Sequence, residues 1–338
     1  MILETAADGL ARAGWFQQAV RSAARVLATD PALLEPCAQF ADLVAPPLVL
    51  PPFTTPADLR AQHLGTPLMA LAEDRPSPAV DERFHWSDGQ QPTAAVLISL
   101  FNYADRIAAA LESVAAQTAE RLELIVVDDS SSDDGAEVVL AWMQAQLQRQ
   151  GHRFSRLLLL RHSRNAGLAT ARNTAFAAAQ APWCFVLDAD NALYPAAVEG
   201  CLQLASSGDD QLAVVHPLLA VEAEPGRPDD QRSLVRPQSW QRGRLRFENM
   251  VDAMALVRRS AWEQAGGYTH IEGGWEDFDF WCKLLDAGFH GVQCPRILAV
   301  YRSHDQSMSH TATNSNWRAL SRTLQQRHPW LELPLARP

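Results

Sequence analysis

The stretch WCFVLDADN, from Trp183 to Asn191, decides the fold of this chain. Its apolar half has the length of a strand, and no polar residue alternates with the apolar ones, which predicts a strand buried on both faces of a parallel sheet. Asp188 and Asp190 follow this strand directly. Ligands bind at the carboxyl ends of such strands, and Mg²⁺ or Mn²⁺ prefers oxygen ligands of this kind. Taken alone, the two acids also fit a solvated turn or a helix cap.

The composition of the 338 residues is that of an ordinary globular protein, with 47% hydrophobic and 20% charged residues. A net charge of -10 argues against non-specific binding to nucleic acid. No apolar run approaches the roughly 20 residues that cross a bilayer, and Met1–Leu10 has acids but no basic segment, so we expect no signal peptide. The five cysteines form no C-x-x-C pair, which predicts reduced thiols in a cytoplasmic protein.

Residues 1–43 have apolar side chains at helical spacing, and Asp30-Pro31 marks the end of one helix and the start of the next. The segment 14–31 resembles one tetratricopeptide repeat. Because a single repeat cannot bury its own apolar face, we expect this hairpin to dock on the rest of the chain or, alternatively, on a protein partner. Residues 44–92 are rich in proline and poor in strand patterns, which predicts a linker packed on the domain that follows.

From Thr93 onward, apolar segments of strand length alternate with helical segments. The expected strands are 94–100, 122–127, 157–160 and 183–187. This alternation predicts right-handed βαβ units and a parallel sheet. Each strand ends in polar or acidic residues, so we expect one ligand-binding edge. The later pattern is less regular, with strands expected at 212–221, 253–257 and 292–301, a loop at 222–241, and helices at 260–265, 273–287 and 317–326.

Six short sequence blocks follow one another along this part of the chain. They are ISLFN (98–102), ALESVAAQT (110–118), IVVDDSSSD (125–133), NAGLATARN (165–173), LDAD (187–190) and GGWEDFD (273–279). In this order they resemble the family 2 glycosyltransferases, which have the GT-A nucleotide-diphospho-sugar transferase fold. The resemblance implies an α/β GT-A domain at 93–310, with a mostly parallel central sheet flanked by helices. An N-terminal helical extension would precede it, and a helical tail at 311–338 would follow.

The resemblance also implies roles at the nucleotide. Ser99, Phe101 and Asn102 would line the nucleotide pocket, although Ser99 stands where the family usually has proline and Phe101 where it usually has tyrosine. Asp129 would accept a hydrogen bond from the base, unless it only caps the helix that follows. Gly167 and Arg172 would lie near the nucleotide, with Arg172 balancing phosphate charge.

For the metal, the resemblance implies that Asp190 ligates the Mn²⁺ or Mg²⁺ ion that bridges the diphosphate. Asp188 would bind the ribose, the metal or both. His304 matches a histidine that completes the metal site in several relatives, and it equally fits a surface histidine with no ligand. We expect other histidines, such as His328, to be solvated.

For the chemistry, the resemblance implies that Asp277 is the catalytic base, with Glu276 the second choice. Trp275 would either stack on the acceptor or belong to the core. Elementary chemistry agrees, because a divalent cation stabilises the charge of a leaving nucleoside diphosphate. A carboxylate on the opposite face of the sugar can remove the acceptor proton. One such displacement inverts the anomeric carbon.

The sequence therefore predicts an inverting, metal-dependent glycosyltransferase of the hexosyltransferase type. It would move a sugar from a nucleotide-diphosphate donor, with UDP favoured, to a hydroxyl of a saccharide, lipid-linked or other acceptor. No Q-x-x-R-W block follows Glu276-Asp277, so we expect a non-processive enzyme. Its location would be cytoplasmic, with any membrane contact peripheral and at the inner face.

Two functions from other classes remain open. One is a catalytically inactive nucleotide-sugar-binding or scaffold protein that acts through its N-terminal helices. The other is a nucleotidyltransferase, which would need a Gly-rich phosphate loop after the first strand, where the chain instead has LFNY (100–103).

Overall fold

The computed structural model describes residues 72–73, 76–223, 233–234, 240–304 and 312–334. The expected hairpin at 1–43, most of the expected linker and most of the loop 222–241 lie outside the described residues. All described residues belong to one unit of the chain, Leu68–Leu335.

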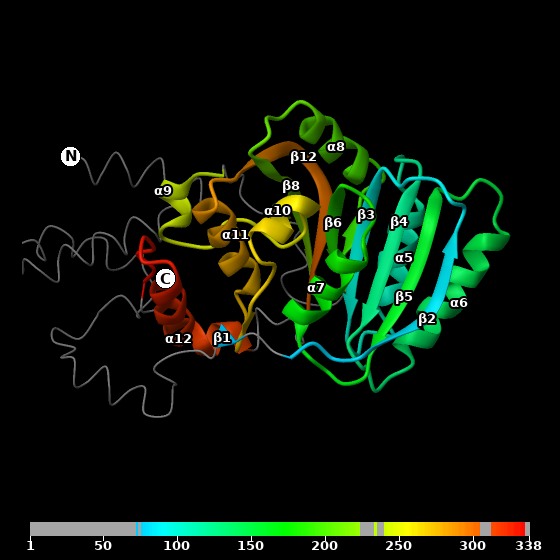
Figure 1. Cartoon of the computed structure of the whole chain (residues 1–338), viewed down its shortest axis with the longest axis horizontal. Helices are drawn as coiled ribbons and strands as arrows, with labels where there is room; N and C mark the ends of the chain where they lie inside the picture. Colours follow the sequence, from blue (N-terminus) through cyan, green and yellow to red (C-terminus); the bar gives the residue numbers. More distant parts are fainter. Residues whose placement is uncertain (1–71, 74–75, 224–232, 235–239, 305–311, 335–338) are drawn as a thin grey trace, which may run out of the picture. The chain divides into compact units, whose positions relative to one another are not determined.

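The first half of the sheet consists of four parallel strands in the order β5-β4-β3-β6. Their bounds are Ala94–Leu100 (β3), Leu122–Asp128 (β4), Phe154–His162 (β5) and Trp183–Asp188 (β6). Almost every residue in them is buried, as the uninterrupted apolar runs predict. Figure 1 shows these strands side by side, with β6 directly beside β3. The expected α/β fold is confirmed, and the complete sheet of the described residues is mixed and has ten strands.

Three helices connect these strands, as the alternating pattern predicts. They are α5 (Ile107–Ala115), α6 (Gly135–Gln148) and α7 (Leu168–Ala178). Side chains alternate between the two faces of a strand, so β3 sends Val96 and Ile98 into a core with α5 and α6. Its residues Ala95 and Leu97 enter a second core, which contains α7. The sheet is therefore covered on both faces, and only its strand ends remain open for a ligand.

The second half of the sheet is mixed. Strand β10 (Leu256–Arg258) lies antiparallel between β6 and β8 (Leu212–Ala223), and β12 (His290–Ser303) runs parallel to β8. The two-residue strand β7 (Ala192–Leu193) pairs antiparallel with β12. This pairing matters for function because it carries the end of β12, with His304 just beyond it, to the residues that follow Asp190.

Several elements were not expected from the sequence. The edge strand β2 (Val80–Ser87) pairs antiparallel with β5, inside the segment expected to be a linker. Most of its residues are exposed, and its charged residues are typical of an edge strand. Apolar alternation is limited to Phe84 and Trp86, which is a short pattern from which to predict a strand. The helix α8 (Ala197–Ser206) was also not expected, nor were α9 (Arg242–Leu245) and the small pairings of β1 (Ala72–Glu73) with β11 (His270–Ile271) and of β9 (Ser233–Leu234) with β8.

The C-terminal part adds three helices. They are α10 (Arg259–Gln264), α11 (Glu276–Asp286) and α12 (Ala312–Arg327). Leu320 and Leu324 of α12 enter the same core as Phe278 and Trp281 of α11. Among the described residues, no helix is both long enough and apolar enough to cross a membrane.

Candidate active site

The carboxyl ends of the parallel strands bring the predicted residues to one edge. Ser99 of β3 pairs with Val127 of β4 on one side and with Asp188 of β6 on the other. Asp129 follows β4 by one residue, and its backbone N–H donates to the carbonyl of Leu100 at 2.8 Å. The predicted nucleotide residues of three different strands therefore lie together, as the parallel topology requires.

Asp129 is 3% exposed and already has three protein partners. Its carboxylate accepts the backbone N–H groups of Ala166 at 2.9 Å and Gly167 at 2.7 Å. Nδ1 of His162 lies 2.6 Å from the same group. These bonds fix the loop before α7, where Gly167 has a φ of 88° that favours glycine. A carboxylate has about four lone-pair sites, so a nucleotide base would share an oxygen that already accepts a bond.

The loops after β3 and β4 are joined by side-chain bonds to backbone. Asn102 donates its backbone N–H to Oγ of Ser131 at 3.0 Å, and its Oδ1 accepts the N–H of Ser132 at 2.8 Å. Asn102 has a φ of 55°, a region that asparagine tolerates better than most residues. Phe101 lies beside it with 44% of its side chain exposed. This rigid junction presents an aromatic face at the edge where the nucleotide is predicted.

Arg172 connects the end of β6 to the start of α11. Its side chain is 3% exposed; Nη2 donates to Asp188 Oδ1 at 2.9 Å and Nη1 donates to Glu276 Oε1 at 2.8 Å. Although burial opposes its charge, the two carboxylates raise the pKa of the guanidinium. Leaving either acid without this partner would cost several kcal/mol, on the order of 3–5. Arg172 therefore fixes the position of Glu276 and Asp277 relative to Asp188.

Asp190 lies against His304. Nε2 of His304 is 2.9 Å from Asp190 Oδ2, and the ring of Tyr103 packs edge-on against the imidazole at 5.8 Å between centroids. Burial and the charge of Asp188 raise the pKa of Asp190. The predicted surface alternative for His304 is wrong, because its side chain is 1% exposed.

The side chains around Asp190 include donors that a divalent cation accepts. Asp190 and His304 offer an oxygen and a nitrogen at hydrogen-bond distance, and a cation can replace the proton that they share. Asp188 turns one oxygen to Arg172 instead. In the described part of the chain no group of three histidine, cysteine or acidic side chains gathers as a ligand set. Asp190 and His304 would hold such a cation through one oxygen and one nitrogen, and would leave its other positions open to a bound substrate.

Asp277 is half-buried in the first turn of α11. Its Oδ1 accepts the N–H of Phe278 at 2.7 Å, and its Oδ2 accepts Nδ2 of Asn249 at 3.2 Å. Burial and the adjacent Glu276 raise the pKa of Asp277 to about 7, while Arg172 opposes the shift. Glu276 is held by Arg172, so Asp277 is the member of the pair with an environment suited to proton transfer at neutral pH.

Trp275 directly precedes this helix. Its side chain is 8% exposed and packs edge-on against Trp317, with 4.7 Å between ring centroids, and against Phe278. Its φ of 67° is left-handed, unusual for a bulky residue. Of the two roles left open by the sequence, the structure places this ring in the core.

One further acid, Asp252, and one amide, Asn249, lie near Asp277 and were not predicted from the sequence. Asp252 is half-buried, its Oδ1 accepts the N–H of Met254 at 2.9 Å, and burial together with the charge of Asp188 raises its pKa to about 6. Asn249 is the donor to Asp277. Both lie in the segment that leads into β10, which pairs antiparallel with β6. No local pattern predicts that pairing, so the sequence carried no signal for either residue.

The prediction that the other histidines are solvated was wrong for His162, His216 and His328, which are all buried. His328 is buried, with Nε2 lying 2.9 Å from Asp279 Oδ1 and Nδ1 lying 2.8 Å from Asp286 Oδ2. Arg327 also donates to Asp279, from Nε at 2.6 Å. These contacts attach the end of α12 to the outer side of α11.

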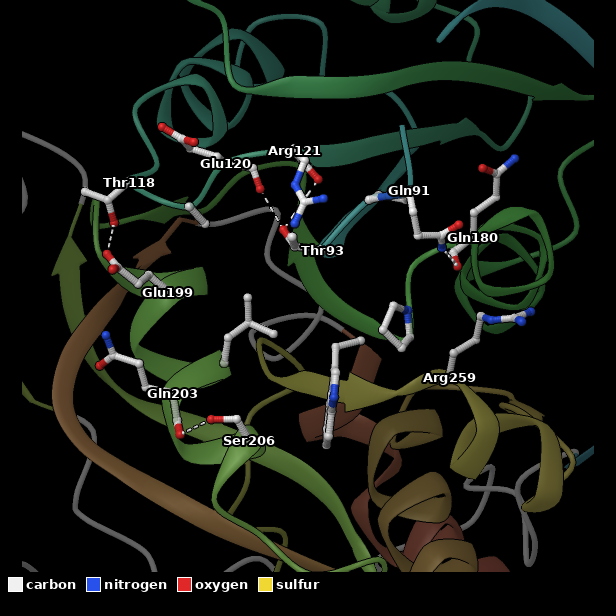
Figure 2. Close-up of a pocket in the computed structure, with 15 residues that line it drawn as sticks. Gln91, Thr93, Thr118, Glu120, Arg121, Gln180, Glu199, Gln203, Ser206 and Arg259 are labelled. Atoms are coloured by element: carbon white, nitrogen blue, oxygen red, sulfur yellow. Dashed lines mark hydrogen bonds between the residues drawn. The ribbon is translucent and has the colours of Figure 1, made fainter. Parts of the chain in front are cut away.

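A cavity of about 990 Å³ lies at the opposite edge of the sheet. It is lined by residues at the amino ends of the strands, among them Thr93, Arg121 and Trp183, and by residues of α8. A seven-residue strand places it roughly 20 Å from Asp188, at about 3.3 Å per residue. Some of its polar groups bond to one another, as Figure 2 shows for Thr118 with Glu199 and for Thr93 with the carbonyl of Glu120. This cavity is separate from the acidic site.

Comparison with known proteins adds an independent finding. The model of the family described as glycosyl transferase family 2 matches residues 95–266, half of the chain. The matched range contains the carboxyl ends of β3, β4 and β6, and it ends before α11.

Individual relatives are distant. The chain is 24% identical over 226 residues to an uncharacterised glycosyltransferase of Haemophilus influenzae, covering 65% of this chain and 72% of that protein. It is 30% identical over 228 residues to the succinoglycan biosynthesis protein ExoU of Rhizobium meliloti, covering 64% of each. Among solved structures, S. aureus TarS in complex with UDP-GlcNAc matches with a TM-score of 0.50 and 16% identity, over 69% of this chain and 66% of that one. The chain spans about two thirds of the length of these proteins, and the last likeness shows the fold alone.

Proposed function

This chain belongs to glycosyl transferase family 2, and from that premise we propose that it transfers a sugar from a nucleotide-diphosphate donor to a hydroxyl acceptor with inversion. The observation that supports this most directly is the position of Arg172. It bonds at 2.9 Å to the Asp188 carboxylate and at 2.8 Å to Glu276, beside Asp277. One ion-paired cluster thus joins the end of β6, which is predicted to hold the donor, to the start of α11, which is predicted to hold the base.

On the donor side, Phe101 offers an exposed ring on which a base can stack, and Ser99 and Asn102 lie on the same edge. Asp129 orients the loop at Gly167, whose backbone approaches the same edge. We propose UDP as the nucleotide. A divalent cation, Mn²⁺ or Mg²⁺, held by Asp190 and His304 would supply charge stabilisation to the leaving diphosphate. Arg172 positions Asp188 beside that pair.

On the acceptor side, Asp277 removes the proton of the attacking hydroxyl. A general base works best when its pKa is near the working pH, and the pKa of Asp277 is raised to about 7. Glu276 accepts a hydrogen bond from Arg172 and is held as its partner. Because one base acts and no second carboxylate attacks the sugar, the displacement is single and inverts the anomeric carbon.

The acceptor in this proposal is a saccharide or a lipid-linked hydroxyl, and one residue is added per encounter. A glycan acceptor is supported by the relative from Rhizobium meliloti, which is named for succinoglycan biosynthesis. The segment 222–241, which the sequence predicts to be a loop, would contribute to acceptor choice, because loops commonly carry specificity.

The test is release of nucleotide from UDP-, GDP- and TDP-sugars, with Mn²⁺ and with EDTA, by the natural chain and by Asp277→Asn and Asp190→Ala. We expect one donor to be hydrolysed slowly, in a reaction that needs the metal and is lost in both variants.

Calorimetry of donor binding is the control. Asp277→Asn should still bind the donor, whereas Asp190→Ala should lose the dependence of binding on Mn²⁺. Binding without release in the natural chain, even with saccharide acceptors, would favour the inactive nucleotide-sugar-binding protein. Binding that is the same with Mn²⁺ and with EDTA would overturn the metal site.

A further inference from the structure

The Asp277 side chain has one hydrogen-bond partner outside its own helix among the described residues, and that partner is Asn249. The bond runs from Asn249 Nδ2 to Asp277 Oδ2 at 3.2 Å. The carbonyl oxygen of the same amide accepts the backbone N–H of Val251 at 3.4 Å. Because the amide oxygen faces a donor, its NH₂ group must face the carboxylate, so the direction of the amide is fixed by the chain itself.

The charges around Asp277 explain why such a donor matters. Glu276 adjoins it on α11, and Asp252, in the segment before β10, also raises its pKa. Arg172 of α7 is the cation that lowers the pKa, and both of its terminal nitrogens are bonded to Asp188 and Glu276. Tyr268 packs against Arg172 and has its own pKa raised by burial. The ionised form of Asp277 therefore depends on neutral donors for direct hydrogen bonds.

We propose that Asn249 is a positioning residue for the proton transfer, which holds the Asp277 carboxylate in one orientation and stabilises its ionised form. This inference rests on the proposed function, since it gives Asp277 the role of base. A carboxylate that accepts a hydrogen bond binds its proton less tightly. With Oδ2 held by Asn249 and Oδ1 by the helix, the plane of the carboxylate is set before any acceptor binds, which is the general advantage of a preorganised site.

The experiment compares the natural chain with Asn249→Ala, Asn249→Asp and Asp277→Asn, using metal-dependent hydrolysis of the best donor from pH 5 to pH 9. In Asn249→Ala we expect the acid limb of the kcat profile to move up by about one unit, with kcat falling about fivefold at pH 7 and the KM for the donor nearly unchanged. Asn249→Asp keeps the size of the side chain but places a carboxylate against Asp277, so the limb should move further in the same direction.

The control is Asn173→Ala. Asn173 also bonds to backbone, accepting from the N–H of Tyr268 and donating to its carbonyl, each at 2.8 Å. Its loss should lower the melting temperature and leave the acid limb in place. A titration of the Asp277 carboxyl followed by ¹³C NMR, assigned by the loss of its signal in Asp277→Asn, measures the same shift without turnover.

The outcomes separate the two proposals. If Asp277→Asn hydrolyses the donor as fast as the natural chain, the base role fails. If Asp277→Asn is inactive but the acid limb and the NMR titration are the same in the natural chain and in both Asn249 variants, only the role of Asn249 fails.

Discussion

On two sides of helix α11, the surroundings of an aspartate shift its pKa in opposite directions. Asp277 and Asp279 are two residues apart on α11, about 200° around its axis. Asp277 faces the acidic site, where burial and Glu276 raise its pKa to about 7. Asp279 faces the C-terminal segment. There, although burial opposes it, hydrogen bonds from His328 and Arg327 lower its pKa to about 2. The pKa of Asp277 lies near neutrality, whereas Asp279 is an anion that binds residues at the end of α12.

This contrast teaches that the partners of a carboxylate decide its role. Asp277 has an amide and a backbone N–H as its hydrogen-bond donors. Asp279 has the guanidinium of Arg327 and the imidazole of His328. The first arrangement leaves ionisation close to balance, and the second stabilises the charge strongly.

The largest expected effect is on turnover. Asp277→Asn should reduce donor hydrolysis and sugar transfer by about 10²–10⁴-fold, because it removes the base but keeps the shape of the side chain. Asp279→Asn, assayed at a temperature where it is folded, should change kcat by no more than a few fold. Steady-state kinetics on both variants check this difference. Equal losses in the two variants would erase the distinction between the two sides of the helix.

The next effect is on stability, where we expect a loss in Asp279→Asn and none in Asp277→Asn. Asp279→Asn should lower the free energy of unfolding by about 3–5 kcal/mol, since it removes the buried anion that pairs with Arg327 and lies within hydrogen-bond distance of His328. Asp277→Asn should leave this free energy unchanged or raise it at pH 6, because the raised pKa of Asp277 already opposes folding there. Urea unfolding followed by tryptophan fluorescence measures both values. A loss in Asp277→Asn as large as that in Asp279→Asn would show that Asp277 also has a structural role.

The pH dependence should differ in sign. The folded pKa of Asp277 is above its unfolded value near 3.9, so its contribution to stability is present at low pH and is lost as the pH rises toward 7. At pH 8 we therefore expect Asp277→Asn to be more stable than the natural chain, by on the order of 2 kcal/mol. The folded pKa of Asp279 is depressed, so its contribution is present above about pH 4 and is lost as the pH falls toward 2. Unfolding curves from pH 3 to pH 8 on the two variants test these opposite slopes.

The smallest expected effect sharpens the comparison at the surface. Arg246 forms an ion pair with Glu332, in which both side chains are about half exposed. Arg246→Ala should lower the free energy of unfolding by less than about 1 kcal/mol, because water screens exposed pairs. The same unfolding assay serves here, and a loss comparable with that of Asp279→Asn would mean that this pair, too, fastens the C-terminal segment.

The sequence predicted the elements that local pattern controls. The uninterrupted apolar runs of β3, β4 and β6 identified buried parallel strands, and the acids after them identified the open edge. The exposed edge strand β2 was not predicted, because it has few apolar residues. His328 was expected to be solvated, since nothing near it in the sequence shows that Asp279 and Asp286 lie on either side of its ring.

The sequence by itself determined the α/β alternation and the gathering of Ser99, Asp129 and Asp188 at one edge. Hydrophobic periodicity is local, and parallel strands bring their carboxyl ends together whatever the loops between them do. Only the tertiary structure decided which acid has which partner. Arg172 meets Glu276 across 104 positions of sequence, and Asn249 meets Asp277 across 28. The proton affinity of a carboxylate depends on such contacts and on burial, and both are set by packing rather than by spacing along the chain.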